Sequence, residues 1–84
     1  MNTKQRRTLK AIFENPVQAT ILWSDIEKLL IACGAEMSEG RGSRVRISLN
    51  GIRAVFHRPH PGKVADKGAV MSMRRFLVEA GVQP

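Results

Sequence analysis

The stretch from Gly40 to Pro61, GRGSRVRISLNGIRAVFHRPHP, contains the clearest structural pattern of the chain. At its centre stands Asn50-Gly51, the dipeptide that best suits a two-residue type I′ turn, because both residues tolerate positive φ. The segments on either side, 44–49 and 52–57, alternate apolar and polar residues, as the strands of a half-buried hairpin do. A two-residue turn sets the register of the two strands. It predicts one apolar face made of three facing pairs: Leu49 with Ile52, Ile47 with Ala54, and Val45 with Phe56.

The opposite face of this hairpin is expected to be cationic. The same register pairs Ser48 with Arg53, Arg46 with Val55, and Arg44 with His57. Between positions 41 and 63 the chain carries six basic residues and no acidic one: Arg41, Arg44, Arg46, Arg53, Arg58 and Lys63. Arginine binds phosphate oxygens with two donors at once, whereas a merely solvated surface normally mixes both signs of charge. We therefore predict that these six residues bind phosphate groups, with a solvated strand face as the alternative.

Both histidines of the chain, His57 and His60, lie at the exit of the hairpin. They are the side chains near the cationic face that can exchange a proton near neutral pH. We predict that they are the catalytic residues. The alternative is that both are surface histidines without a function. A metal site is not favoured, because the two histidines supply two ligands at best. Cys33 follows the apolar stripe of a predicted helix and is expected to be inert core rather than a ligand or nucleophile.

The composition predicts one basic, intracellular domain. The chain has 84 residues, 43% of them hydrophobic, with a formal net charge of +7. Such a charge favours a polyanionic partner, either nucleic acid or an acidic protein. The single cysteine excludes an internal disulfide, and the apolar runs are too short to span a bilayer. We expect a cytoplasmic protein, a single domain over 1–84, without a membrane segment or a small-molecule cofactor.

The rest of the chain predicts three helices and one more strand. Ser24 and Glu27 have the spacing of a capping box that would begin the second helix, and Asp66 suits the N-terminus of the last helix. Trp23 is expected at the edge of the core. The predicted elements are helices at 3–14, 24–33 and 67–80, and a strand at 35–39 before the hairpin. This order, helix, helix, three antiparallel strands, helix, is typical of an α+β domain whose helices cover the apolar face of the sheet.

The order of several short motifs resembles that of the HicA family of bacterial toxins. The motifs are Leu29-Leu30, Gly34, Gly42-Ser43, the hairpin with its basic loop, Lys67-Gly68, and Glu79-Ala80-Gly81. The resemblance covers a core of residues 24–82, and residues 1–16 look like an N-terminal helical addition. It implies a fold like that of double-stranded-RNA-binding domains. It also implies a toxin of a type II toxin–antitoxin system, a metal-independent endoribonuclease that cuts mRNA and is neutralised by a cognate HicB-like antitoxin.

The chain departs from the HicA pattern at the position of the catalytic base. The family keeps a Gly-Ser-His motif on its second strand, but here the motif reads Gly42-Ser43-Arg44. An arginine cannot readily accept a proton. Because the register pairs Arg44 with His57, we predict that His57 replaces the missing base. Arg44 and Arg46 would stabilise charge on the phosphate, and His60 would assist or act as the acid.

Two other functions remain open from the sequence. One is a non-catalytic RNA-binding module that has lost its base, and the other is a basic domain that docks an acidic protein. Stacking of single-stranded bases is not favoured, because the predicted cationic face carries no aromatic residue. Recognition of an RNA backbone and its shape is the better fit.

Overall fold

The computed structural model describes residues 1–60 and 62–84. Its elements, in chain order, are α1 (Thr3–Ile12), α2 (Trp23–Ala32), β1 (Glu36–Glu39), β2 (Arg44–Leu49), β3 (Ile52–His57) and α3 (Lys67–Glu79). The predicted α+β class and the order of elements are confirmed. Pro61, the last residue of the stretch 40–61, lies outside the described residues. Among the described helices, none combines the length and the apolar content needed to cross a membrane.

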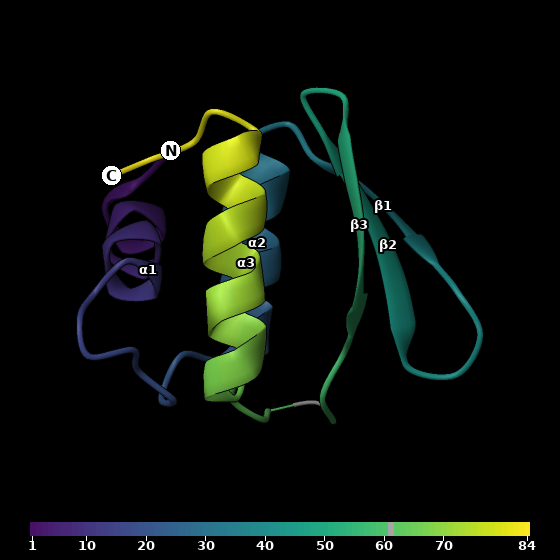
Figure 1. Cartoon of the computed structure of the whole chain (residues 1–84), viewed down its shortest axis with the longest axis horizontal. Helices are drawn as coiled ribbons and strands as arrows, with labels where there is room; N and C mark the ends of the chain where they lie inside the picture. Colours follow the sequence, from purple (N-terminus) through teal and green to yellow (C-terminus); the bar gives the residue numbers. More distant parts are fainter. Residues whose placement is uncertain (61) are drawn as a thin grey trace.

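The molecule has three layers (Figure 1). The sheet, in the order β1-β2-β3, forms one outer layer, α2 and α3 form the middle layer, and α1 lies on the far side of these two helices. The core between the layers draws on every element except β1. Its most completely buried side chains are Ile12, Ile26, Leu29, Leu30, Val45, Ile47, Leu49, Val70, Met73 and Leu77. The helices therefore cover one face of the sheet and leave the other face open.

The hairpin has the predicted register. Strands β2 and β3 pair from Leu49 opposite Ile52 at the turn to Arg44 opposite His57 at the open end. Asn50 and Gly51 both have positive φ, 51° and 82°, as a type I′ turn requires. The pairing that sequence alternation and the turn dipeptide predicted is thus confirmed for all six pairs.

Asn50 has a second role, which makes its replacement a test of the turn. Its side-chain Nδ2 donates a hydrogen bond of 2.8 Å to the carbonyl of Ala80, at the C-terminal end of α3. Asn50→Ala is expected to lower the free energy of unfolding by about 1–2 kcal/mol, because alanine is disfavoured at positive φ and cannot donate this bond. Asn50→Gly should lose about 1 kcal/mol or less, since only the hydrogen bond is removed. Urea denaturation of both proteins checks this, and equal losses would contradict the role of the backbone conformation.

The predicted capping box at the start of α2 is wrong. The helix begins at Trp23, its N-cap is Leu22, and no side chain caps it. Leu22, in the segment before the helix, forms an antiparallel bridge with Val64. The Trp23 N–H donates a hydrogen bond to the carbonyl of Lys63, the residue before Val64. This pairing fixes the entry to the helix before Ser24. Glu27 is consequently free to accept hydrogen bonds from other partners.

Helix α1 is capped and locked to the rest of the molecule. Asn2 and Gln5 form a reciprocal capping box at its start. The helix ends at Ile12, earlier than predicted, and Arg74 of α3 binds carbonyls at and just beyond this end. The Arg74 guanidinium donates to the carbonyl oxygens of Ile12 (2.8 Å) and Glu14 (2.7 Å). At the other end of the chain, Asp66 caps α3 as predicted, accepting from the Ala69 N–H at 2.7 Å.

Candidate functional site

The open face of the sheet carries the predicted cationic platform. Because successive side chains of a strand point to opposite faces, the residues alternating with the buried ones project away from the helices. In β2 and β3 these are Arg44, Arg46, Ser48, Arg53, Val55 and His57. All are exposed except Ser48, which is half-buried. We call these six residues the outer sheet face.

The outer sheet face is hollowed. A concave surface of about 510 Å³ runs across all three strands and includes Arg46, Arg53 and Val55. Strand β1 adds Glu36 and Ser38 to its lining, because Glu36 pairs with Ser48 and Ser38 with Arg46. These two β1 residues were not predicted, because the sequence indicates no register for β1. The carboxylate of Glu36 therefore lies at the β1 edge of a hollow whose other charged residues, Arg46 and Arg53, are basic.

The pair Arg44 and His57 lies at the open end of the hairpin. The two residues face each other across β2 and β3, and both are exposed. Side chains that face each other in this way have Cβ atoms about 4.5–5.5 Å apart. The two side chains therefore share one small region of the outer sheet face, next to Arg46.

Arg58 does not belong to the outer sheet face. It follows His57 directly, so alternation turns its side chain to the helix-covered side. There its Nε donates to Glu27 at 2.7 Å and its Nη1 donates to Glu39 at 2.6 Å. These hydrogen bonds, first to Glu39 and then to Glu27, raise the pKa of the Arg58 guanidinium. The residue predicted to bind phosphate is instead held by two carboxylates that tie α2, β1 and the end of β3 together.

Glu27 is the centre of this arrangement. Besides Arg58, its Oε2 accepts a hydrogen bond of 2.7 Å from the indole Nε1 of Trp23. Trp23 itself is buried against Phe56 of β3, with ring centroids 6.0 Å apart. We call Trp23, Glu27, Glu39 and Arg58 the anchor cluster. It fixes the strand end that carries His57.

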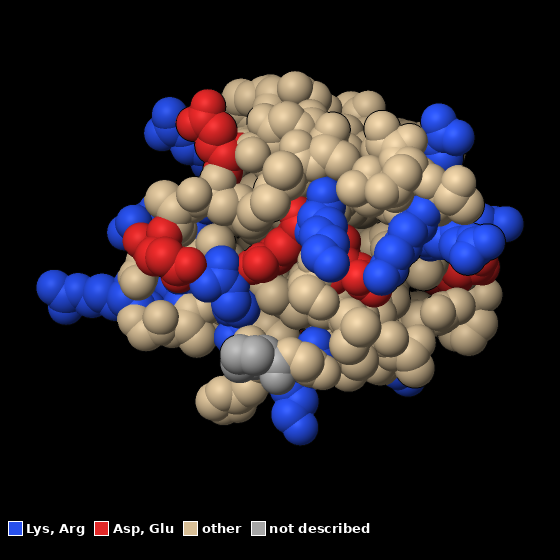
Figure 2. Space-filling model, turned by 180° about the vertical axis from the view of Figure 1, so that it is seen from behind, with Lys and Arg blue, Asp and Glu red and all other residues tan. Residues whose placement is uncertain are grey.

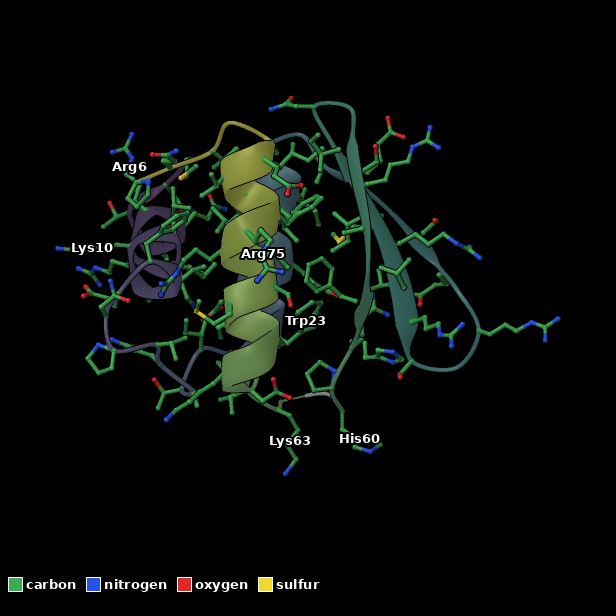
Figure 3. All side chains as sticks on the ribbon, in the orientation of Figure 1. Arg6, Lys10, Trp23, His60, Lys63 and Arg75 are labelled. Carbon is green, nitrogen blue, oxygen red and sulfur yellow. The ribbon has the colours of Figure 1, made fainter. Side chains whose placement is uncertain are left out.

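His60 lines a separate hollow. Together with Gly42, Ser43, Arg58 and Pro59 it surrounds a concave surface of about 440 Å³. The hairpin extends to this point, because the N–H of Arg58 donates to the Ser43 carbonyl at 2.7 Å. Figure 3 shows His60 pointing away from the body of the molecule. The two predicted catalytic histidines therefore sit at the same end of the hairpin but line different surfaces.

The last two predicted phosphate-binding residues lie outside the sheet. Arg41 is exposed in the turn between β1 and β2. Lys63 is exposed in the segment before α3, and its side chain projects near that of His60 in Figure 3. The structure thus brings Arg44, Arg46, Arg53 and His57 together on one face, and distributes the other basic residues around its end.

Charges of both signs lie on the back of the molecule. Figure 2 shows the face that carries α2, and there Asp and Glu side chains alternate with Lys and Arg. Two of the contacts made by α2 on this side are ion pairs, Arg58 with Glu27 and Lys4 with Asp25 (3.6 Å). Acidic side chains are thus interspersed with basic ones on this face.

The aromatic residues and the cysteine take no part in the outer sheet face. Trp23, Phe56 and Phe76 are buried, and Phe13 packs beneath Arg74. Cys33 is half-buried at the C-terminal end of α2, and burial raises the pKa of its thiol. Within residues 1–60 and 62–84, no three His, Cys, Asp or Glu side chains come close enough together to hold a metal ion.

Comparison with known proteins identifies a family whose model matches most of the chain. The family model described as "HicA toxin of bacterial toxin-antitoxin" matches residues 23–82, which is 60 of the 84 residues. The matched region contains α2, the whole sheet and α3, and leaves out α1. Neither a curated protein nor a solved structure matches the chain.

Proposed function

Because the chain belongs to the HicA family of bacterial toxins, we propose that it is a metal-independent endoribonuclease that cuts mRNA with His57 as the general base. Membership of the family makes it the toxin of a toxin–antitoxin system, with RNA as its general substrate and a cognate antitoxin as its partner. The proposal adds the mechanism and the residues. It also treats residues 24–82 as the toxin core and residues 1–16 as an addition to it.

One observation supports this assignment above the others. The register pairs His57 with Arg44, the position at which the HicA pattern has histidine. A histidine on β3 can therefore reach nearly the same space as one at position 44 on β2. The imidazole is exposed on the open face of the sheet, where an RNA strand has access to it. Arg46, next to Arg44 on the same face, supplies further positive charge.

The proposed reaction needs only the side chains of this chain and the RNA. His57 accepts the proton of a ribose 2′-OH, and the 2′-oxygen attacks the adjacent phosphorus. The bond from phosphorus to the 5′-oxygen of the next nucleotide breaks, which leaves a 2′,3′-cyclic phosphate. Arg44 and Arg46 stabilise the negative charge that develops on the phosphate oxygens. The departing 5′-oxygen takes a proton, for which His60 is the candidate donor.

A cleavage assay on purified protein tests the proposal. Wild type is expected to cut RNA in the presence of EDTA, and His57→Ala is expected to lose about 10²- to 10⁴-fold in rate, the usual contribution of a general base. His60→Ala should lose less, and Arg75→Ala, which removes an exposed arginine of α3, should keep the wild-type rate. If His57→Ala and His60→Ala both cut RNA as wild type does, the catalytic assignment is wrong. Loss of cleavage with EDTA would instead overturn the metal-independent mechanism.

The arginine at position 44 favours a second function, a non-catalytic RNA-binding module. It predicts binding to duplex RNA that weakens steeply with salt, without cleavage and without growth arrest on expression. Val55, 57% exposed between the arginines of the outer sheet face, favours a third, the docking of an acidic protein partner. In that case charge reversal at Arg46 and Arg53 would abolish the protein complex, and RNA binding would be undetectable even at low salt.

A further inference from the structure

Helix α1 carries a second basic surface that the toxin core does not explain. Its ten residues contain Lys4, Arg6, Arg7 and Lys10 and no acidic residue. With Glu14, residues 1–22 contribute a net charge of +3 (four basic, one acidic), out of +7 for the chain. This segment precedes the region 23–82 that matches the family model.

Three of these cations form one outward stripe. Residues three and four apart are neighbours on a helix, so Lys10 lies next to both Arg6 and Arg7. The opposite side of α1, with Thr8, Leu9 and Ile12, is buried against the rest of the molecule. Figure 3 shows Arg6 and Lys10 projecting away from the body. We call Arg6, Arg7 and Lys10 the α1 stripe.

The α1 stripe is unfavourable for the protein alone. Neighbouring like charges on a helix repel each other, and Lys10 lies between Arg6 and Arg7 on this surface. Of the four cations on α1, Lys4 has an ion-pair partner, Asp25. In the part of the chain that the structure describes, the three residues of the stripe have none. An external anion would remove this repulsion.

The stripe is presented rigidly and beside a hollow. Arg74 holds the end of α1 through the Ile12 and Glu14 carbonyls and stacks over Phe13, 5.8 Å from its ring centroid. Arg7 also lines a concave surface of about 460 Å³ between α1 and the segment before α2. Gln18 and Thr20 add polar groups to that surface, and its one carboxylate, Asp25, is paired with Lys4.

We propose that the α1 stripe is a second binding surface for the phosphate backbone of RNA, independent of the outer sheet face. Nucleic acid is favoured over a protein because three adjacent cations form the stripe and one large apolar side chain, Leu22, is exposed in the hollow beside it, whereas the centre of a protein interface is normally apolar. The outer sheet face, by contrast, exposes Val55. This inference rests on the proposed function in that the ligand is RNA, but it does not require cleavage.

The two surfaces face in opposite directions. In Figure 1, α1 and the sheet form the two outer layers, with α2 and α3 between them. The longest dimension of the molecule is 31 Å. The phosphates held by the α1 stripe are therefore different from those held by the sheet. A straight RNA duplex cannot contact both surfaces at once, so each surface should bind RNA independently of the other.

Matched double variants test the inference. Binding of a fluorescent 2′-O-methyl RNA duplex, which lacks the nucleophilic 2′-OH, is measured by anisotropy over a series of salt concentrations. In the Arg46→Gln/Arg53→Gln background, which weakens the outer sheet face, adding Arg6→Gln/Lys10→Gln should weaken binding at least tenfold near 0.1 M salt. It should also reduce the slope of log K against log salt by about 2, one for each lost phosphate contact. The control Lys67→Gln/Arg75→Gln removes the same two residue types from α3 and should leave the slope unchanged. Circular dichroism verifies that all the variants are folded.

The outcomes separate this inference from the proposed function. A lower slope for the α1 variant than for the Arg46→Gln/Arg53→Gln background supports the α1 stripe. If only the sheet variant lowers the slope, the inference is wrong and the proposed RNA platform stands. If the α1 variant and the α3 control lose the same amount of RNA affinity, the effect comes from net charge alone and the inference is wrong. Failure of wild type to bind the duplex, or binding of an acidic protein instead, would also overturn it.

Discussion

The double variant Arg44→His/His57→Arg is expected to cleave RNA within about tenfold of the wild-type rate, whereas His57→Ala alone loses about 10²- to 10⁴-fold. The reason is the facing register of the two residues on the outer sheet face. Exchanging them moves the base across one strand pair, over a Cβ separation of about 5 Å, and keeps one arginine and one histidine in the same region. The measurement is the initial rate of cleavage of one labelled RNA by each purified protein.

A control for this exchange is a histidine placed elsewhere on the same face. In the His57→Ala background, Arg53→His puts an imidazole four residues away on β3, about 13 Å along the strand. This variant should cleave RNA no faster than His57→Ala alone. If the exchanged variant is folded and binds RNA but cuts no faster than His57→Ala, the replacement of the missing base by His57 is contradicted.

Glu27→Ala is expected to lower the free energy of unfolding by about 3 kcal/mol, because it leaves the Trp23 indole N–H and one side of the Arg58 guanidinium without their acceptor. The Glu27 side chain is 23% exposed and that of Arg58 33% exposed, so water replaces these bonds poorly. Since Arg58 directly follows His57, the rate of RNA cleavage should fall as well. Chemical denaturation in urea measures the loss of stability.

The anchor cluster contains its own control. Glu39 bonds to the same guanidinium at 2.6 Å, but its side chain is 69% exposed. Glu39→Ala should therefore cost only about 0.2–1 kcal/mol, as exposed ion pairs do. Glu27→Gln, which keeps an acceptor oxygen for Trp23, should fall between the two. Equal effects of Glu27→Ala and Glu39→Ala would show that burial does not decide the strength of this cluster.

The hairpin was predictable because its determinants are local. Asn50-Gly51 favours one turn type, and strict alternation allows one register for burying the apolar residues. All six predicted pairs of β2 and β3 follow from these two facts. The facing of Arg44 and His57, on which the proposed function rests, is therefore a consequence of local sequence.

Other features depended on partners distant in sequence. The capping box of Ser24 and Glu27 did not form because the pairing of Leu22 with Val64 starts the helix earlier, and Trp23 and Arg58 then bind the Glu27 carboxylate. Continuing the alternation of β3 by one residue would have turned Arg58 to the inner side. The contacts of Arg58 with Glu27 and Glu39 depend on how α2 and β1 pack against the end of β3.

The α+β class, the hairpin and its cationic face follow from the sequence, because turn preference and alternation act between near neighbours in the chain. Three other features come from tertiary contacts: the binding of Arg58 by Glu27 and Glu39, the entry of Glu36 into the hollow of the outer sheet face, and the hydrogen bonds from Arg74 to the end of α1. Each of these is a contact between separate elements. Its energy depends on packing distances that no local pattern encodes.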